Sequence, residues 1–139
     1  MNNALYSFSR PGNEPMQGYL PGAPERAALE AELLRQSSQQ VEIPLILGGR
    51  PVHTGRTGKV VMPCDHGHVL ATVHKAGAAE VRQAVDAALK ARQGWLELSY
   101  QERGAIFLKA AELISRRYRY LLNAATMLGQ GKNAYQAEV

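Results

Sequence analysis

The pattern of apolar and polar positions divides the chain into an arm, a strand region and a helical region. Residues 1–24 contain four prolines and no apolar periodicity. This composition predicts an extended arm or loop that lies outside the core. Pro24 suits the first turn of a helix, where its missing N–H costs nothing. Because Leu29, Leu33 and Leu34 follow at helical spacing, we expect a surface helix over residues 25–40.

The middle of the chain has the pattern of two strand pairs. Residues 41–47 are apolar and β-branched, Gly48-Gly49 follows, and residues 51–53 resume the strand pattern. This order predicts a strand, a tight turn and a short return strand. Residues 59–62 and 69–74 predict a second pair. They flank a predicted loop at residues 63–68, in which we expect Gly67 at positive φ and Asp65 bonded to local N–H groups.

The period becomes helical from Ala78 onward. Val81, Val85 and Leu89 form one apolar stripe, and we expect this helix to end at Gly94 and Trp95. Ser99 and Glu102 form a capping box that begins a second helix, which we expect to run to about Arg117. Its expected apolar face consists of Ile106, Phe107, Ala110, Leu113 and Ile114.

A third helix is expected over residues 118–128, closed by Gly129 and Gly131 as C-caps. Asn133 and Gln136 then form another capping box, so a further helix is expected to begin just before Val139. We interpret this as the front piece of a longer protein.

Few strands are available to cover these helices, which indicates an incomplete α/β domain. We expect exposed apolar helix faces for the same reason. We divide the chain into an arm with the first helix (residues 1–40) and an incomplete domain (residues 41–139).

Composition indicates a globular protein rather than a disordered one. Of the 139 residues, 45% are hydrophobic and 20% are charged. No apolar run approaches the ~20 residues of a membrane helix, and no secretory or transit pattern is recognised at the start. Cys64 is the single cysteine, so no internal disulfide can form. We therefore expect a reducing compartment, the cytoplasm.

The net charge of +4 leaves open a role in binding an acidic partner. The densest basic patch consists of Arg116, Arg117 and Arg119. No nucleic-acid recognition motif accompanies it, so we expect no nucleic-acid partner. A non-catalytic basic module that binds an acidic partner through this patch is kept as an alternative function.

Residues 64–68, Cys-Asp-His-Gly-His, are the one segment rich in potential metal ligands. Zinc sites normally use spaced pairs of such residues, and none is present. A polar turn is therefore favoured over a small metal protein. Cys64 as a nucleophile would need activation by a base such as His66, and a small loop residue is the simpler interpretation.

The segment Gly129-Gln130-Gly131-Lys132 partly resembles a phosphate-binding loop. That motif requires a glycine where Thr126 stands and Ser or Thr where Asn133 stands, so the match fails. A dinucleotide fingerprint and a Ser-His-Asp arrangement are not recognised either, and the acids are expected on solvated helix faces. We therefore predict no catalytic, cofactor-binding or metal residue in this stretch.

Several segments together resemble the front of the aldehyde dehydrogenase superfamily. Residues 63–73 resemble the strand-turn-strand that enters the cofactor domain of these enzymes. Residues 81–88 and Trp95 are similar to the first helix, Glu102-Arg103 to the beginning of the next, and Gly131-Lys132 to the pair before a further long helix.

Within the superfamily the chain is most similar to the 1-pyrroline-5-carboxylate dehydrogenase branch. This similarity rests above all on residues 66–68, His-Gly-His. The segments that agree with it are residues 24–26, Ile43-Pro44 with the Gly-Gly turn, residues 109–113, residues 129–132 and residues 136–138. Asp65 departs from the Asn usual in the family before His-Gly-His.

The resemblance implies the N-terminal part of the aldehyde dehydrogenase fold: an extended arm, short edge strands and outer helices of the NAD-binding domain. It implies NAD-dependent oxidation of L-glutamate γ-semialdehyde to L-glutamate by a cysteine thiolate and a glutamate base, in a homo-oligomeric enzyme. None of those groups has a matching position here, and Cys64 does not correspond to the catalytic cysteine. A dehydrogenase for another substrate, such as succinate semialdehyde, is the nearest alternative.

Overall fold

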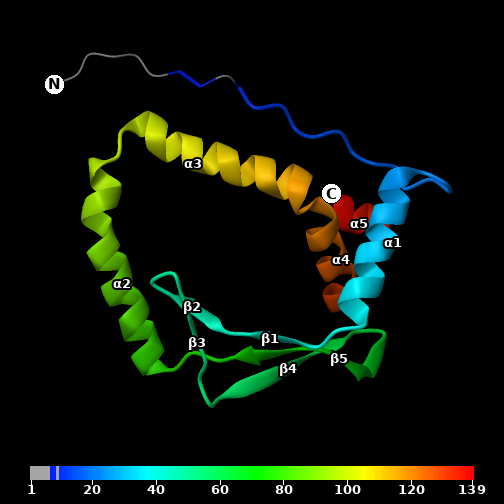
Figure 1. Ribbon diagram of the computed structural model, residues 1–139, viewed down its shortest axis with the longest axis horizontal. Coiled ribbons are helices and arrows are strands. Elements are labelled where there is room, and N and C mark those ends of the chain that lie inside the picture. Colours follow the sequence, from blue (N-terminus) through cyan, green and yellow to red (C-terminus); the bar gives the residue numbers. More distant parts are fainter. Residues whose placement is uncertain (1–6, 9) are drawn as a thin grey trace.

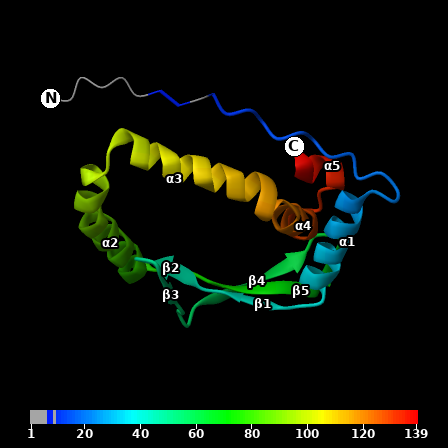
Figure 2. The same ribbon diagram turned by 45° about the horizontal axis from the view of Figure 1, so that its top comes forward.

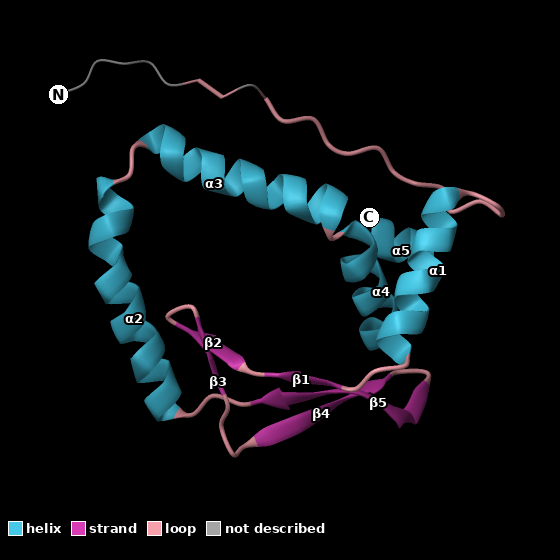
Figure 3. Cartoon of the chain, in the orientation of Figure 1, coloured by secondary structure: helices cyan, strands magenta, loops and turns pink. Residues whose placement is uncertain are grey.

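The strands lie along one side of the molecule, at the bottom of Figure 1. The helices lie along its other sides, so that strands and helices together form a frame. The computed structural model describes residues 7–8 and 10–139. In chain order the elements are α1 (Pro24–Ser37), β1 (Val41–Ile43), β2 (Leu45–Leu47), β3 (Arg50–Val52), β4 (Thr57–Met62), β5 (Asp65–His74), α2 (Ala78–Glu97), α3 (Tyr100–Glu112), a π-helical turn η1 (Leu113–Arg117), α4 (Arg119–Gln130) and α5 (Ala134–Glu138). The predicted mixture of helices and strands is confirmed (Figure 3).

The first strand segment is divided between two sheets. β1 pairs in parallel with β5, whereas β2 pairs antiparallel with β3. The single strand predicted over residues 41–47 is therefore wrong, because Pro44 separates the two parts and has no N–H to donate to a ladder. The predicted tight turn is confirmed: Gly48 and Gly49 have φ of 56° and 78°, which a two-residue hairpin turn requires and glycine adopts without strain.

The predicted loop over residues 63–68 is also wrong. Only Pro63 and Cys64 form the turn, and β5 begins at Asp65 and pairs antiparallel with β4. The register of this pairing shifts on both sides of Val61, an irregularity of the β-bulge type, and the pairing then continues to Met62 and Asp65. Gly67 lies inside β5 without positive φ, although the expected local bond is present, since its N–H donates to Asp65 Oδ1 at 3.1 Å.

Helix α2 passes through Gly94 and Trp95 and ends at Glu97, later than predicted. The N-cap of the next helix explains its end. Ser99 has extended backbone, and its N–H donates to the Glu102 carboxylate at 2.8 Å while Ser99 Oγ accepts the Glu102 N–H. This confirms the predicted capping box, which fixes the break between α2 and α3.

A wide turn forms the corner between α3 and α4 (Figure 1). The Tyr118 N–H donates to the Leu113 carbonyl at 2.8 Å, five residues back, so the last turn of the predicted second helix is π-helical. At the far end of α4, Gly131 adopts φ of 69° and its N–H donates to the Met127 carbonyl. Gly129 lies inside α4, so its predicted role as a C-cap is wrong and only Gly131 has that role.

The second predicted capping box, at Asn133, is present. Asn133 Oδ1 accepts the Gln136 N–H at 2.8 Å, and Gln136 Oε1 accepts the Asn133 N–H at 3.0 Å. Lys132 is thus followed by the first turn of α5 and preceded by α4. A helix and not a strand therefore leads into this segment, as expected, and the absence of a phosphate-binding loop stays a prediction.

The core lies where α1 packs against α4, side by side in both views (Figures 1 and 2). It centres on Leu29, Ala124 and Tyr19, all buried. Tyr19 comes from the arm, so the prediction that residues 1–24 lie outside the core is wrong at this point. Tyr19 also has φ of 50°, which costs about 1 kcal/mol for a side chain of this kind.

Helices α2 and α3 have little to pack against among the described residues. Phe107 on α3 is 67% exposed, and Val85 and Leu89 on α2 are also exposed. The predicted exposure of apolar helix faces is confirmed. No helix in the described ranges is both long and apolar enough to cross a bilayer.

A buried carboxylate joins the arm to the last two helices. The Glu138 side chain is only 1% exposed and pairs with Arg119. It accepts hydrogen bonds from Tyr19 Oη at 2.6 Å, Asn123 Nδ2 at 2.8 Å and the Gln17 N–H at 2.9 Å. The expectation that every acid lies on a solvated helix face is therefore wrong for Glu138.

This network shifts the pKa values of its members. Burial by itself would raise the pKa of Glu138, but the hydrogen bonds from Arg119, Tyr19, Gln17 and Asn123 outweigh it, so the pKa lies below its usual value. Burial and the neighbouring Glu138 raise the pKa of Tyr19 to about 12. The cluster therefore holds an anionic carboxylate beside a neutral phenol at neutral pH.

Two glycines near the end of α4 give a matched pair of substitutions. Gly131→Ala should lower the free energy of unfolding by roughly 1 kcal/mol, because alanine is strained at this φ. Gly129→Ala should raise it by about 0.5–1 kcal/mol, because Gly129 is helical and its added Cβ meets no atom. Urea unfolding followed by circular dichroism measures both, and equal effects of the same sign would contradict the assigned caps.

Glu138→Gln should lower the free energy of unfolding by about 3 kcal/mol at neutral pH. The reason is that Arg119 loses its charged partner in a buried site. Exposed Glu97 on α2 provides the control, and Glu97→Gln should change stability by less than about 0.5 kcal/mol.

The difference between wild type and Glu138→Gln should also depend on pH. Because the folded-state pKa of Glu138 is depressed, its stabilisation is complete above the unfolded value of about 4.3. It is lost as pH falls through the folded-state pKa. Unfolding curves across this acid range should converge for the two proteins, and a constant difference down to the lowest pH would contradict the role of the ionised carboxylate.

Candidate functional site

The structure places the potential metal ligands of residues 64–68 on a turn and on β5. Cys64 lies exposed in the turn before β5. His68 Nε2 lies 2.9 Å from the carbonyl of Ser37, at the end of α1, so this ring is engaged in holding α1 to β5. Among the described residues, side chains that could hold a metal ion converge elsewhere. That residues 64–68 bind no metal ion stays a prediction.

The basic patch is not presented as one surface. Arg119 is buried against Glu138, and its guanidinium also donates to the Pro15 carbonyl at 2.7 Å. Arg117 is exposed and lies over the Tyr118 ring, 5.3 Å from its centroid. Only Arg116 and Arg117 of the predicted three remain on the surface, which weakens the alternative of a basic binding module.

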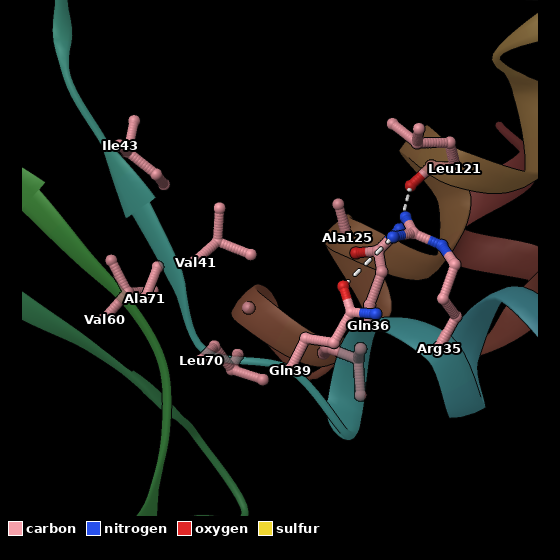
Figure 4. Close-up of a pocket in the computed structure, with 12 residues that line it drawn as sticks. Arg35, Gln36, Gln39, Val41, Ile43, Val60, Leu70, Ala71, Leu121 and Ala125 are labelled. Atoms are coloured by element: carbon pink, nitrogen blue, oxygen red, sulfur yellow. Dashed lines mark hydrogen bonds between the residues drawn. The ribbon is translucent and has the colours of Figure 1, made fainter.

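A hollow of about 290 Å³ lies between α1, α4 and the three-stranded sheet (Figure 4). The strands and α4 line it with apolar side chains, among them Val41, Ile43 and Leu121. At its polar edge, Gln36 Nε2 donates to the Leu121 carbonyl at 2.9 Å. The lining contains no nucleophile and no general base, so this hollow suits packing of an apolar segment rather than catalysis.

A second polar cluster combines Glu42, His53 and His74. Glu42 lies on β1, His74 ends β5, and His53 follows β3 directly. His74 Nε2 lies 2.7 Å from Glu42 Oε1, and His53 Nδ1 lies 3.3 Å from both of those atoms. The His74 ring is only 6% exposed, whereas Glu42 and His53 are open to solvent.

In this cluster the negative charge of Glu42 and a positive charge on His74 stabilise each other. The hydrogen bond from His74, with a smaller contribution from His53, lowers the pKa of Glu42. The hydrogen bond to Glu42 raises the pKa of His74 against the opposing effect of burial. The three groups could therefore act as a hydrogen-bonded ion pair or hold a cation.

Sequence reasoning confined the candidate metal ligands to residues 64–68 and did not connect Glu42, His53 and His74. The three positions are 11 to 32 residues apart, without the short spacings of known metal motifs. They meet because β1 pairs in parallel with β5 in the register Glu42↔Thr72, which places Glu42 next to the end of β5. The one available signal, two histidines at strand ends, does not specify that pairing.

Comparison with known proteins gives the chain its relatives. The model of the aldehyde dehydrogenase family matches residues 52–139. The chain is 47% identical over 137 residues to the delta-1-pyrroline-5-carboxylate dehydrogenase of Agaricus bisporus, covering 98% of this chain and 25% of that protein. It is 38% identical to the mitochondrial delta-1-pyrroline-5-carboxylate dehydrogenase of Homo sapiens, covering 91% of this chain and 23% of that protein.

Solved structures give the same result. The delta-pyrroline-5-carboxylate dehydrogenase of Mycobacterium tuberculosis bound with NAD is 39% identical, with a TM-score of 0.93 over 98% of this chain and 26% of that one. The 1-pyrroline-5-carboxylate dehydrogenase of Thermus with bound NAD is 31% identical, with a TM-score of 0.86 over 96% of this chain and 26% of that one.

These matches extend over nearly all of this chain but over only part of each relative. The chain spans about a quarter of the length of the relatives that it matches. Their names confirm the resemblance to the 1-pyrroline-5-carboxylate dehydrogenase branch that residues 66–68 indicated. On the family model and the backbone likeness together, the chain belongs to the aldehyde dehydrogenase family.

Proposed function

We propose that this chain is part of an NAD-dependent 1-pyrroline-5-carboxylate dehydrogenase, which oxidises L-glutamate γ-semialdehyde to L-glutamate in proline degradation. The observation that supports this most is the backbone likeness to the M. tuberculosis enzyme bound with NAD, at 39% identity over 98% of the chain. The likeness includes the arm, the sheet and the helices. A shared fold alone would be weak support, because one fold can serve many reactions; the identity and the names of the relatives make it specific.

In this proposal the described residues supply framework and no reacting group. Cys64 lies in an exposed two-residue turn, whereas a catalytic thiol needs a base or a helix N-terminus to activate it. The exposed faces of α2 and α3 and the apolar hollow beside α4 are surfaces that the rest of the enzyme covers. The thiolate nucleophile, the general base and the NAD contacts lie outside these residues.

We further propose that the complete enzyme is a cytoplasmic homo-oligomer that binds no nucleic acid. The unpaired Cys64 suits a reducing compartment. Light scattering of the complete enzyme tests the oligomeric state, and a monomer would contradict the proposal. Cell fractionation tests the compartment, and a mitochondrial fraction would contradict it.

The activity is tested with two purified proteins, the 139-residue chain and a product extended to the full length of its relatives. The extended protein should reduce NAD when given L-glutamate γ-semialdehyde, measured by NADH absorbance. The 139-residue chain should give no turnover above background, because it lacks the nucleophile.

Succinate semialdehyde serves as the competing substrate. A higher kcat/KM for it than for L-glutamate γ-semialdehyde would favour a different dehydrogenase of the same family. Turnover by the 139-residue chain alone would overturn the placement of the reacting groups outside it.

A further inference from the structure

Three segments far apart in the chain bring nitrogen and oxygen ligands together at one edge of the sheet. Glu42 is on β1, His74 is at the end of β5, and His53 follows the β2–β3 hairpin. Their potential ligand atoms all lie within 4.8 Å of one another. We infer that Glu42, His53 and His74 form a binding site for a divalent transition-metal cation of the Zn²⁺ type, a property that goes beyond the dehydrogenase activity proposed above.

The distances between the ligand atoms fit a tetrahedral ion. Ligands about 2.0–2.1 Å from a tetrahedral centre lie roughly 3.3 Å from one another. His53 Nδ1 is 3.3 Å from His74 Nε2 and 3.3 Å from Glu42 Oε1. The third distance, from His74 Nε2 to Glu42 Oε1, is 2.7 Å and must lengthen by about 0.6 Å. The Glu42 side chain is 60% exposed and is free to make that shift.

The second ring nitrogen of His74 is already held by the backbone. His74 Nδ1 lies 2.6 Å from the Thr54 carbonyl oxygen and 2.9 Å from the Thr54 backbone nitrogen, so the Thr54 backbone can partner Nδ1 in either tautomer. Histidines that bind metals commonly donate their other N–H to a carbonyl or carboxylate, which fixes the tautomer and the ring orientation. In the metal-bound form Nδ1–H would donate to the Thr54 carbonyl, and the ion would displace the proton that Nε2 shares with Glu42, so that the Nε2 lone pair binds the ion. The buried His74 ring is thereby positioned before any ion arrives.

The donor set selects the class of cation. Two imidazoles with one carboxylate suit Zn²⁺, Co²⁺ and Ni²⁺, whereas Mg²⁺ and Ca²⁺ prefer oxygen ligands alone. His53 is 53% exposed, so the fourth position opens to solvent and a water molecule would complete it. A bound ion would connect the three-stranded sheet to the β2–β3 hairpin, which among the described residues belongs to a separate sheet.

Untagged protein is titrated with Zn²⁺ by isothermal calorimetry and with Co²⁺ by visible absorption. We expect one ion per chain and the strong d–d bands of four-coordinate Co²⁺. His53→Ala and Glu42→Gln should each weaken binding at least about 10-fold, since loss of even an outer partner of a metal site has that effect. Both side chains are exposed, so neither variant should lose its fold, which circular dichroism checks.

His66→Ala is the matched control, because His66 is an exposed histidine in the segment 64–68. It should leave the affinity and the Co²⁺ spectrum unchanged. Loss of binding in His66→Ala but not in His53→Ala would assign the ion to that segment and overturn the proposal. The absence of saturable binding to wild type, or equal affinity in His53→Ala and Glu42→Gln, would leave the cluster as a hydrogen-bonded network and would also overturn it.

Discussion

The carboxylate of Glu138 is the point on which the arrangement of the arm and the last two helices depends. It is nearly inaccessible to solvent and is bound by groups from α4 and from the arm, while itself lying on α5. A buried charge of this kind is tolerated only because its partners satisfy it fully. The same bonds keep Tyr19 at an unfavourable φ and close the core formed by α1 and α4. One short helix thus connects α4 to the arm, which lies more than a hundred residues away in the chain.

Helix caps and tight turns could be predicted from the sequence, because each depends on residues that are close together in the chain. Ser99 with Glu102, Asn133 with Gln136 and Gly48 with Gly49 each specify a cap or turn within four residues, and the structure contains all three. Predictions that depended on distant pairing were less successful. The different partners of β1 and β2 on the two sides of Pro44, and the start of β5 at Asp65, are set by which strands pair and in which register.

The polar clusters illustrate the same limit. Glu138 was predicted to lie on a solvated helix face with the other acids, because nothing near it in the sequence indicates Tyr19 or Arg119 as partners. Glu42, His53 and His74 were not connected because only the parallel pairing of β1 with β5 brings them together. Membership of the aldehyde dehydrogenase family, by contrast, could be inferred from the sequence, since it rests on the order of short segments and not on their contacts.

The π-helical turn between α3 and α4 has a consequence for the geometry of the whole frame. Its Tyr118-to-Leu113 hydrogen bond closes a loop one residue longer than an α-helical turn. A chain with one residue fewer at residues 113–117 would regain α-helical spacing, which rotates everything after it by about 100° around the helix axis. Arg119 and Glu138 both follow this turn, so their ion pair would move as a unit, and the direction of α3 relative to that pair would change. The π-helical turn and the non-helical backbone of Tyr118 (φ −102°, ψ 7°) therefore set the direction in which α3 leaves the packed unit of α1, α4 and α5.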